Sequence, residues 1–180
     1  MKAVLIFFGL MLLFACSSSG PNPFDRDWDT PFGTPPFDEI RVQHYKPAFI
    51  KGMRLEKQAV DAIVNNPAAP DFENTIEALE FSGLPLSRVE NVFYNMTESM
   101  SDKKIQAVEK EMAPVLSAHE DDILLNAALF DRIRLVWEEK ETLELNQEQN
   151  RLLEDTYKRF AGNGANLNES DRGQTGPSQS

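Results

Sequence analysis

Few residues of this chain are of the types that carry out hydrolytic or metal chemistry. Its histidines are His44 and His119, and its one cysteine is Cys16. A zinc-binding H-E-x-x-H helix needs two histidines four residues apart with a glutamate between them, and neither histidine here is followed by Glu-x-x-His. The sequence also lacks a G-x-S-x-G motif, a phosphate-binding glycine loop and a cysteine-based metal spacing. We therefore predict no catalytic residue and no metal ligand in this chain.

The two histidines have simpler structural explanations. His119 falls on the apolar side of an expected helix, where a hydrogen-bonded core histidine is far commoner than a lone metal ligand. His44 stands just before Pro47 at an expected helix entry, so we predict that it makes a local hydrogen bond to the backbone.

A group of glutamates could be read as a paired-carboxylate site: Glu138, Glu139, Glu141 and Glu144. These residues spread around an expected helix end and beyond it. Such a spread favours a solvated face over a metal or acid–base site.

The N-terminus is typical of a bacterial lipoprotein signal. Lys2 precedes an apolar stretch over residues 3–14, which is too short for a bilayer core that needs about 20 residues. Leu13-Phe14-Ala15-Cys16 is similar to a lipobox, which makes Cys16 the expected lipid attachment site after removal of residues 1–15. The alternative is an ordinary signal that leaves a soluble periplasmic protein with a free thiol. We expect a lipid anchor at the cell envelope, on the periplasmic side or at the outer membrane, because a lone exposed thiol is a liability in an oxidising compartment.

The chain is acidic, with 18 basic and 29 acidic residues and a formal net charge of −11. Removing residues 1–15 takes away one base and no acid. Because such a surface repels phosphate backbones and anionic headgroups, we expect no nucleic-acid partner and membrane contact through the lipid only. The hydrophobic content of 41% and its periodic spacing argue against a disordered acidic chain.

Residues 16–37 are rich in proline, which denies the chain helix and sheet hydrogen bonds. This composition predicts an extended tether of roughly polyproline stiffness. The tether also contains four aromatic residues: Phe24, Trp28, Phe32 and Phe37. We expect these rings to pack against the helical body, because a pure spacer does not need aromatic side chains.

Beyond the tether, apolar residues recur with the period of a helix, so residues 38–167 are predicted to be an all-α, antiparallel helical domain. About five helices are expected: one over about 47–65, a second capped by Asp71 or Asn74, a third capped by Ser101, a fourth from Asn126 to about Lys140, and a fifth from Asn146 to about Ala161. Gly83 and Pro85 should bend the second helix, and Pro114 should kink the third. The apolar side of the third is predicted to carry Ile105, Val108, Met112, Val115 and His119.

Several strings at helix ends and connections resemble the thimet-oligopeptidase-like metallopeptidases, and within them the bacterial peptidyl-dipeptidases and oligopeptidase A. They are residues 36–40 (PFDEI), 44–49 (HYKPAF), 65–76 (NNPAAPDFENTI), 126–130 (NAALF), 151–154 (RLLE) and 164–167 (GANL). The strings occur in the right order over about 130 residues. They belong to the scaffold of that family and transfer no catalytic residue.

The resemblance implies a lobe that caps or walls the substrate channel of a zinc peptidase. The family uses a zinc-activated water and a glutamate base to hydrolyse short peptides, and peptidyl-dipeptidases release dipeptides from peptide C-termini. Zinc is thus implied for the full-length enzyme and not for this chain, whose expected partner is the missing catalytic lobe. The family continues with helix where residues 168–180 have no large apolar side chain. We therefore expect a divergent, disordered tail and a chain truncated before the catalytic domain.

The expected function is that of an N-terminal lobe that is inactive by itself. Two alternatives stay open at this point. One is a stand-alone, membrane-anchored helical binding or scaffold lipoprotein, and the other is a chain that complements a separately encoded catalytic half.

Overall fold

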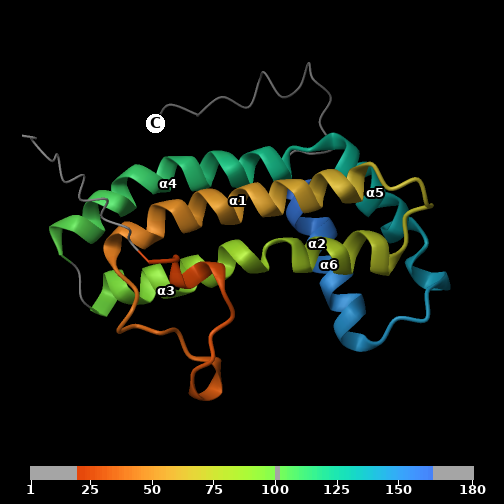
Figure 1. The fold of residues 1–180 in the computed structure, drawn as a ribbon. Coiled ribbons are helices and arrows are strands. Elements are labelled where there is room, and N and C mark those ends of the chain that lie inside the picture. Colours follow the sequence, from red (N-terminus) through yellow and green to blue (C-terminus); the bar gives the residue numbers. More distant parts are fainter. Residues whose placement is uncertain (1–19, 100–101, 164–180) are drawn as a thin grey trace, which may run out of the picture.

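The computed structural model describes residues 20–99 and 102–163, and the regular structure in these ranges is helical throughout. Three long helices lie side by side, with α1 (Val42–Val64) between α3 (Leu84–Ser99) and α4 (Lys103–Leu124) (Figure 1). The neighbour α3 runs antiparallel to α1, whereas α4 runs parallel to it (Figure 1). Two further helices, α5 (Ala127–Glu138) and α6 (Gln147–Gly162), pack together near the C-terminal end of α1. The prediction of an all-α fold is confirmed for the described residues.

The first helix begins at Val42 and not near residue 47, so the predicted start was wrong. The backbone N–H of Arg41 donates to Nδ1 of His44 (3.1 Å), and the His44 N–H donates to the Arg41 carbonyl (2.9 Å). These two bonds close the first turn ahead of Pro47, which the helix accommodates in its interior. The predicted role of His44, a local hydrogen bond to the backbone, is confirmed.

The second predicted helix consists of three consecutive pieces. Asp71 and Asn74 cap its start reciprocally, with Asp71 Oδ1 accepting from the Asn74 N–H (2.7 Å) and Asn74 Oδ1 from the Asp71 N–H (3.1 Å). A wide π-helical turn (Phe72–Glu77) then leads into α2 (Ala78–Ser82). The helix is interrupted at Gly83 before α3 begins, close to where the sequence predicts a bend.

The third predicted helix, α4, is capped by Asp102, whose carboxylate accepts two backbone N–H groups of the first turn. The predicted cap was Ser101, so that prediction was wrong by one residue; Ser101 itself lies outside the described residues. The helix continues through Pro114 without a break. Val115 was predicted on the apolar side but is 45% exposed, because α4 packs along α1 and leaves most of its circumference uncovered.

Asparagine caps start the last two helices, as the sequence predicts. Asn126 Oδ1 accepts from the Leu129 N–H (3.0 Å) and opens α5, and Asn146 Oδ1 accepts from the Gln149 N–H (2.9 Å) and opens α6. A short 3₁₀ turn (Lys140–Thr142) lies between the two helices. The predicted solvated face is confirmed, since four glutamates around this turn are all exposed: Glu138, Glu139, Glu141 and Glu144.

Part of the proline-rich segment that precedes α1 packs against α1 and α3. A 3₁₀ turn (Pro23–Asp25) places the Phe24 ring 5.7 Å from that of Tyr45. The guanidinium of Arg88 stacks over the Trp28 ring at 3.7 Å and donates to a backbone carbonyl of the same segment. The prediction that Phe24 and Trp28 pack against the body is therefore confirmed.

The other two aromatic residues of this segment are more exposed. Phe32 is fully exposed in a second 3₁₀ turn (Pro31–Gly33), where its backbone is left-handed (φ 60°), and Phe37 is 48% exposed. The packing predicted for Phe32 was wrong, because the Pro31–Gly33 turn projects away from the helices (Figure 1).

Several predictions fall on residues that the structure does not describe. The predicted lipid attachment at Cys16, the predicted signal over residues 1–15 and the predicted divergent tail over residues 168–180 lie outside the described ranges. Among the described helices, none combines the length and the apolar character needed to cross a membrane.

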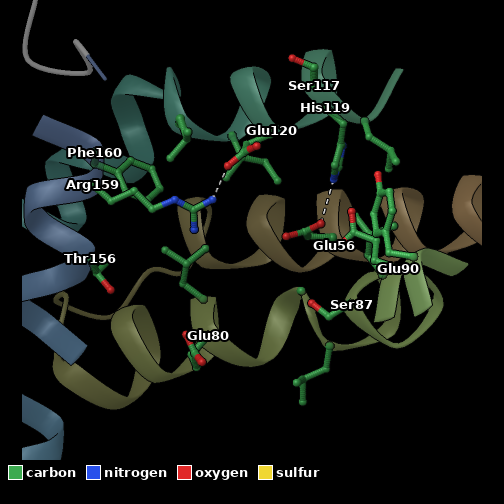
Figure 2. Close-up of a pocket in the computed structure, with 18 of the residues that line it drawn as sticks. Glu56, Glu80, Ser87, Glu90, Ser117, His119, Glu120, Thr156, Arg159 and Phe160 are labelled. Carbon is green, nitrogen blue, oxygen red and sulfur yellow. Dashed lines mark hydrogen bonds and ion pairs between the residues drawn. The ribbon is translucent and has the colours of Figure 1, made fainter. Parts of the chain in front are cut away.

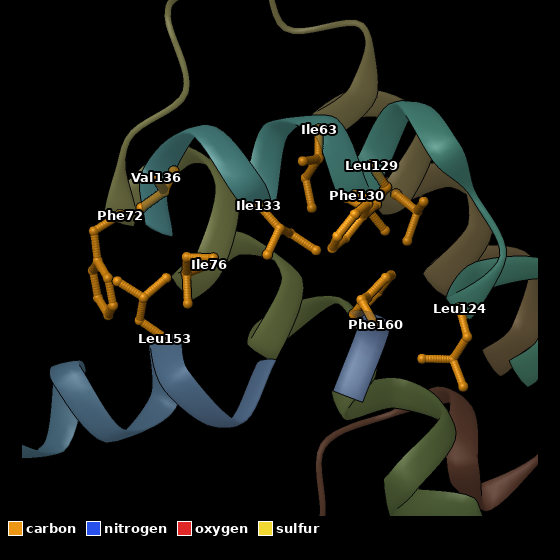
Figure 3. Packing of buried hydrophobic residues seen from close by; sticks show 11 residues of the cluster. Ile63, Phe72, Ile76, Leu124, Leu129, Phe130, Ile133, Val136, Leu153 and Phe160 are labelled. Atoms are coloured by element: carbon orange, nitrogen blue, oxygen red, sulfur yellow. The ribbon is translucent and has the colours of Figure 1, made fainter. Parts of the chain in front are cut away.

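Two hydrophobic clusters hold the helices together, and α1 contributes to both. The α5–α6 cluster consists of Val60, Ile63, Phe72, Ile76, Leu124, Leu129, Phe130, Ile133, Val136, Leu153 and Phe160 (Figure 3). The α3–α4 cluster consists of Ile40, Tyr45, Ala48, Phe49, Leu86, Val89, Val92, Phe93, Ile105 and Met112. The N-terminal part of α1 packs in the α3–α4 cluster and its C-terminal part packs in the α5–α6 cluster, so the packing partners of α1 change along its length.

Gly52 allows α1 and α3 to approach closely. A Cβ atom on Gly52 would lie 2.9 Å from the Cα of Leu86. We therefore expect Gly52→Ala to lower the free energy of unfolding by about 1–3 kcal/mol, because the two helices must move apart. Gly162→Ala is the matched control, since its Cβ meets nothing within 4 Å and alanine favours a helix. Urea denaturation followed by circular dichroism tests the pair, and equal stability of the Gly52 variant and the parent would contradict the close approach.

Candidate functional site

A groove of about 520 Å³ opens on the side of the molecule where α1 lies between its neighbours (Figure 2). α1 forms its floor, α4 and the α2–α3 segment form its walls, and α6 closes one end (Figure 2). Leu86 of the α3–α4 cluster lines one part of it, and Leu124 and Phe160 of the α5–α6 cluster line another. The groove therefore lies at the boundary between the two clusters.

The polar lining of the groove is mainly acidic. Four carboxylates line it: Glu56, Glu80, Glu90 and Glu120. Arg159 is the one lysine or arginine among the residues that line this groove, and its guanidinium donates to Glu120 at 2.7 Å. The four carboxylates outnumber this one guanidinium, so the lining of the groove carries a net negative charge.

His119 and Glu56 join the two helices that meet at the groove floor. Their Nε2 and Oε2 atoms are 2.9 Å apart, and the side chains are only 12% and 16% exposed. The other carboxylate oxygen of Glu56, Oε1, lies beside Gly83, the residue between α2 and α3. A Cβ atom added to Gly83 would be 3.1 Å from this oxygen. His119 is therefore a hydrogen-bonded interior histidine, as the sequence predicts.

The described residues offer neither metal ligands nor an activated nucleophile. No group of three or more His, Cys, Asp or Glu side chains in residues 20–99 and 102–163 is arranged to hold a metal ion. Ser87 and Ser117 line the groove, but in the same ranges no hydroxyl is hydrogen-bonded to His119. The described residues thus do not pair His119 with a hydroxyl nucleophile of this chain.

Two of the groove carboxylates, Glu80 and Glu90, have no hydrogen-bond or ion-pair partner among the described residues, and of the two only Glu90 is partly buried, since Glu80 is exposed. Glu90 lies on α3. Burial raises the pKa of Glu90 above its ordinary value, the carboxylates of Glu56 and Glu120 raise it further, and His119 lowers it. The ionised form of Glu90 is thus less favourable in the folded chain than in water.

This raised pKa predicts a pH-dependent gain of stability on removing the charge. A carboxyl whose pKa is raised by folding stabilises the fold below its ordinary pKa, and that contribution is lost as the pH rises through the raised value. We expect Glu90→Gln to raise the free energy of unfolding at pH 7 by less than about 1 kcal/mol, since the site is partly screened by solvent. Near pH 4 the gain should vanish.

Melting temperatures measured at both pH values test this expectation. Glu144→Gln, on an exposed carboxylate with no partner among the described residues, is the control and should change little at either pH. A Glu90 variant that is less stable than the parent at pH 7 would contradict the assignment.

Sequence reasoning identified His119 but missed the carboxylates around it. Glu56 carried a usable signal, because it shares the apolar side of its helix with Met53 and Val60 at spacings of three and four residues. A charged residue at such a position is expected to have a buried partner. Glu90 gave no comparable signal, because its proximity to the others depends on how α3 packs.

Comparison with known proteins gives relatives but no matching family model. The chain is 43% identical over 151 residues to a dipeptidyl carboxypeptidase of Salmonella typhimurium and 40% identical over 151 residues to one of Escherichia coli. It is 22% identical over 138 residues to oligopeptidase A of Salmonella typhimurium. The first two matches cover 84% of this chain, which spans 22% of the length of each relative, and the third covers 77% of this chain and 20% of the relative.

Proposed function

We propose, from the homology of this chain to part of the bacterial dipeptidyl carboxypeptidases, that its described residues form a non-catalytic helical lobe of a peptidase of this type. The observation that carries the proposal is the match over 151 residues, which covers 84% of this chain. The groove supports it, because its polar groups are suited to binding and include no nucleophile in contact with a base. In this proposal the lobe helps to wall the channel that admits short peptides.

The residues present do not fit a zinc site. His119 is hydrogen-bonded to Glu56, His44 is bonded to the backbone at the start of α1, and the described residues contain no third ligand near either. In the proposed enzyme, any zinc and the water that it activates would be held by other polypeptide. We derive no catalytic step from this chain.

We also propose that the lobe is held at a bacterial envelope membrane through Cys16. The support is the signal-like sequence before Cys16 and the acidic composition, which disfavours direct attraction to anionic lipid. Several acyl chains on one cysteine would give stable anchoring, where a single chain gives only marginal binding.

The proposal predicts that the chain alone does not hydrolyse peptides. The purified 180-residue chain, supplied with zinc and an internally quenched peptide, should show no fluorescence increase above buffer. The Escherichia coli dipeptidyl carboxypeptidase serves as the positive control under the same conditions. Hydrolysis that a chelator abolishes, and that is lost in His119→Ala but kept in His44→Ala, would place catalysis in this chain and overturn the proposal.

A second candidate is a stand-alone helical binding module. The observation in its favour is that both hydrophobic clusters are assembled from the described residues alone, which supports autonomous folding. A cooperative melt of the isolated chain as a monomer is the result expected for such a module. A broad transition with strong binding of a hydrophobic dye would instead favour a lobe that needs the rest of an enzyme.

A further inference from the structure

The walls of the groove expose apolar side chains that no described residue covers. Leu84 at the start of α3 is 56% exposed and Tyr94 on the same helix is 41% exposed. Both line the groove, together with the partly buried Leu116 and Ile123 of α4. Large apolar side chains gathered beside a concave surface are typical of an interaction site.

The charges of the groove specify which apolar surface could cover it. Glu56 and Glu120 already have internal partners in His119 and Arg159. Glu90 has no such partner among the described residues, and covering it would bury an uncompensated carboxylate. Burying a charge is costly unless an opposite charge accompanies it. A segment that brings a cation to Glu90 is therefore favoured over an apolar segment that leaves this carboxyl to be protonated.

The source of that segment follows from the charge and the length of the chain. A second copy of this acidic chain, with a net charge of −11, would mostly bring further carboxylates to the groove. The greater part of each dipeptidyl carboxypeptidase relative lies outside the matched stretch, since this chain spans 22% of its length. Polypeptide of that kind is the partner that the proposed function requires.

We infer that the groove between α4 and the α2–α3 segment docks a stretch of the remaining peptidase chain that presents a lysine or arginine between apolar side chains. The cation lies against Glu90, and the apolar side chains cover Leu84 and Tyr94. This inference rests on the proposed function and adds to it the surface through which the lobe joins the rest of the enzyme.

Peptide binding tests the inference directly. Overlapping synthetic peptides that tile the Salmonella typhimurium relative outside the matched stretch are labelled and titrated with the full 180-residue chain, and fluorescence anisotropy gives the Kd. We expect binding by peptides that combine a basic residue with apolar residues, and none by peptides that lack either. Glu90→Gln and Leu84→Ser should each weaken that binding about tenfold, which corresponds to 1.4 kcal/mol.

Matched variants keep the result interpretable. Glu144→Gln removes an exposed carboxylate away from the groove and should leave the Kd unchanged, and circular dichroism confirms that each variant is folded. Absence of binding by every peptide, or binding that neither groove variant weakens, would overturn the inference. Equal binding of basic apolar peptides unrelated to the relative would assign the groove to free peptides and also overturn it. None of these results bears on hydrolysis, so the proposed function fails or stands on the activity assay separately.

Discussion

Replacing Phe93 with alanine should lower the free energy of unfolding by about 3–5 kcal/mol. Phe93 is 1% exposed at the centre of the α3–α4 cluster, and its ring centroid lies 4.9 Å from that of Tyr45 and 5.2 Å from that of Phe49. Both contacts are edge-on, the arrangement that aromatic pairs prefer. Loss of the ring removes its burial and leaves a cavity between α1 and α3 that rigid helices cannot fill.

Urea denaturation followed by circular dichroism measures this effect, and Phe81→Ala provides the control. Phe81 is 58% exposed on α2, so its truncation should change the free energy of unfolding by no more than about 0.5 kcal/mol. If the two variants unfolded at the same urea concentration, the ring cluster around Phe93 would not stabilise the contact between α1 and α3.

The caps of α5 and α6 were predictable because capping is a local interaction. Asn126 and Asn146 each accept a hydrogen bond from the residue three positions later, and sequence alone places both partners. The start of α1 was missed because His44 acts as the capping partner of Arg41, a role usually taken by glutamate or glutamine. Pro47 then misled the prediction, since proline is commonest in the first turn of a helix.

The groove was not predictable, because the residues that form it are brought together by packing. Glu56 and His119 are 63 positions apart in sequence, and Arg159 and Glu120 are 39 positions apart. The first pair joins α1 to α4 and the second joins α6 to α4, so both depend on how α4 packs against helices that are distant in sequence. Periodicity identifies which side of a helix is apolar but not which helix lies against it.

The string over residues 65–76, which resembles the metallopeptidases, has a physical role in this fold. It starts at the C-terminal end of α1 and runs into the π-helical turn. Two of its backbone carbonyls accept hydrogen bonds from a side chain outside the segment. Arg132 of α5 reaches across to it: one nitrogen donates to the carbonyls of Asn66 (3.1 Å) and Ala68 (3.4 Å), and another to Asn74 Oδ1 (2.9 Å). A connection that looks like a loop in sequence is thus fixed by a distant arginine.

Arg132→Met should therefore lower the free energy of unfolding by about 2–4 kcal/mol. Arg132 is only 9% exposed, and its removal takes away the three hydrogen bonds that tie this connection to α5 at the edge of the α5–α6 cluster. Arg134→Met on the same helix is the control, because that arginine pairs with exposed carboxylates and such surface pairs contribute little to stability. Hydrogen exchange should also quicken at residues 65–71 in the Arg132 variant alone. Equal losses in the two variants would mean that Arg132 acts as a surface charge and does not hold this connection.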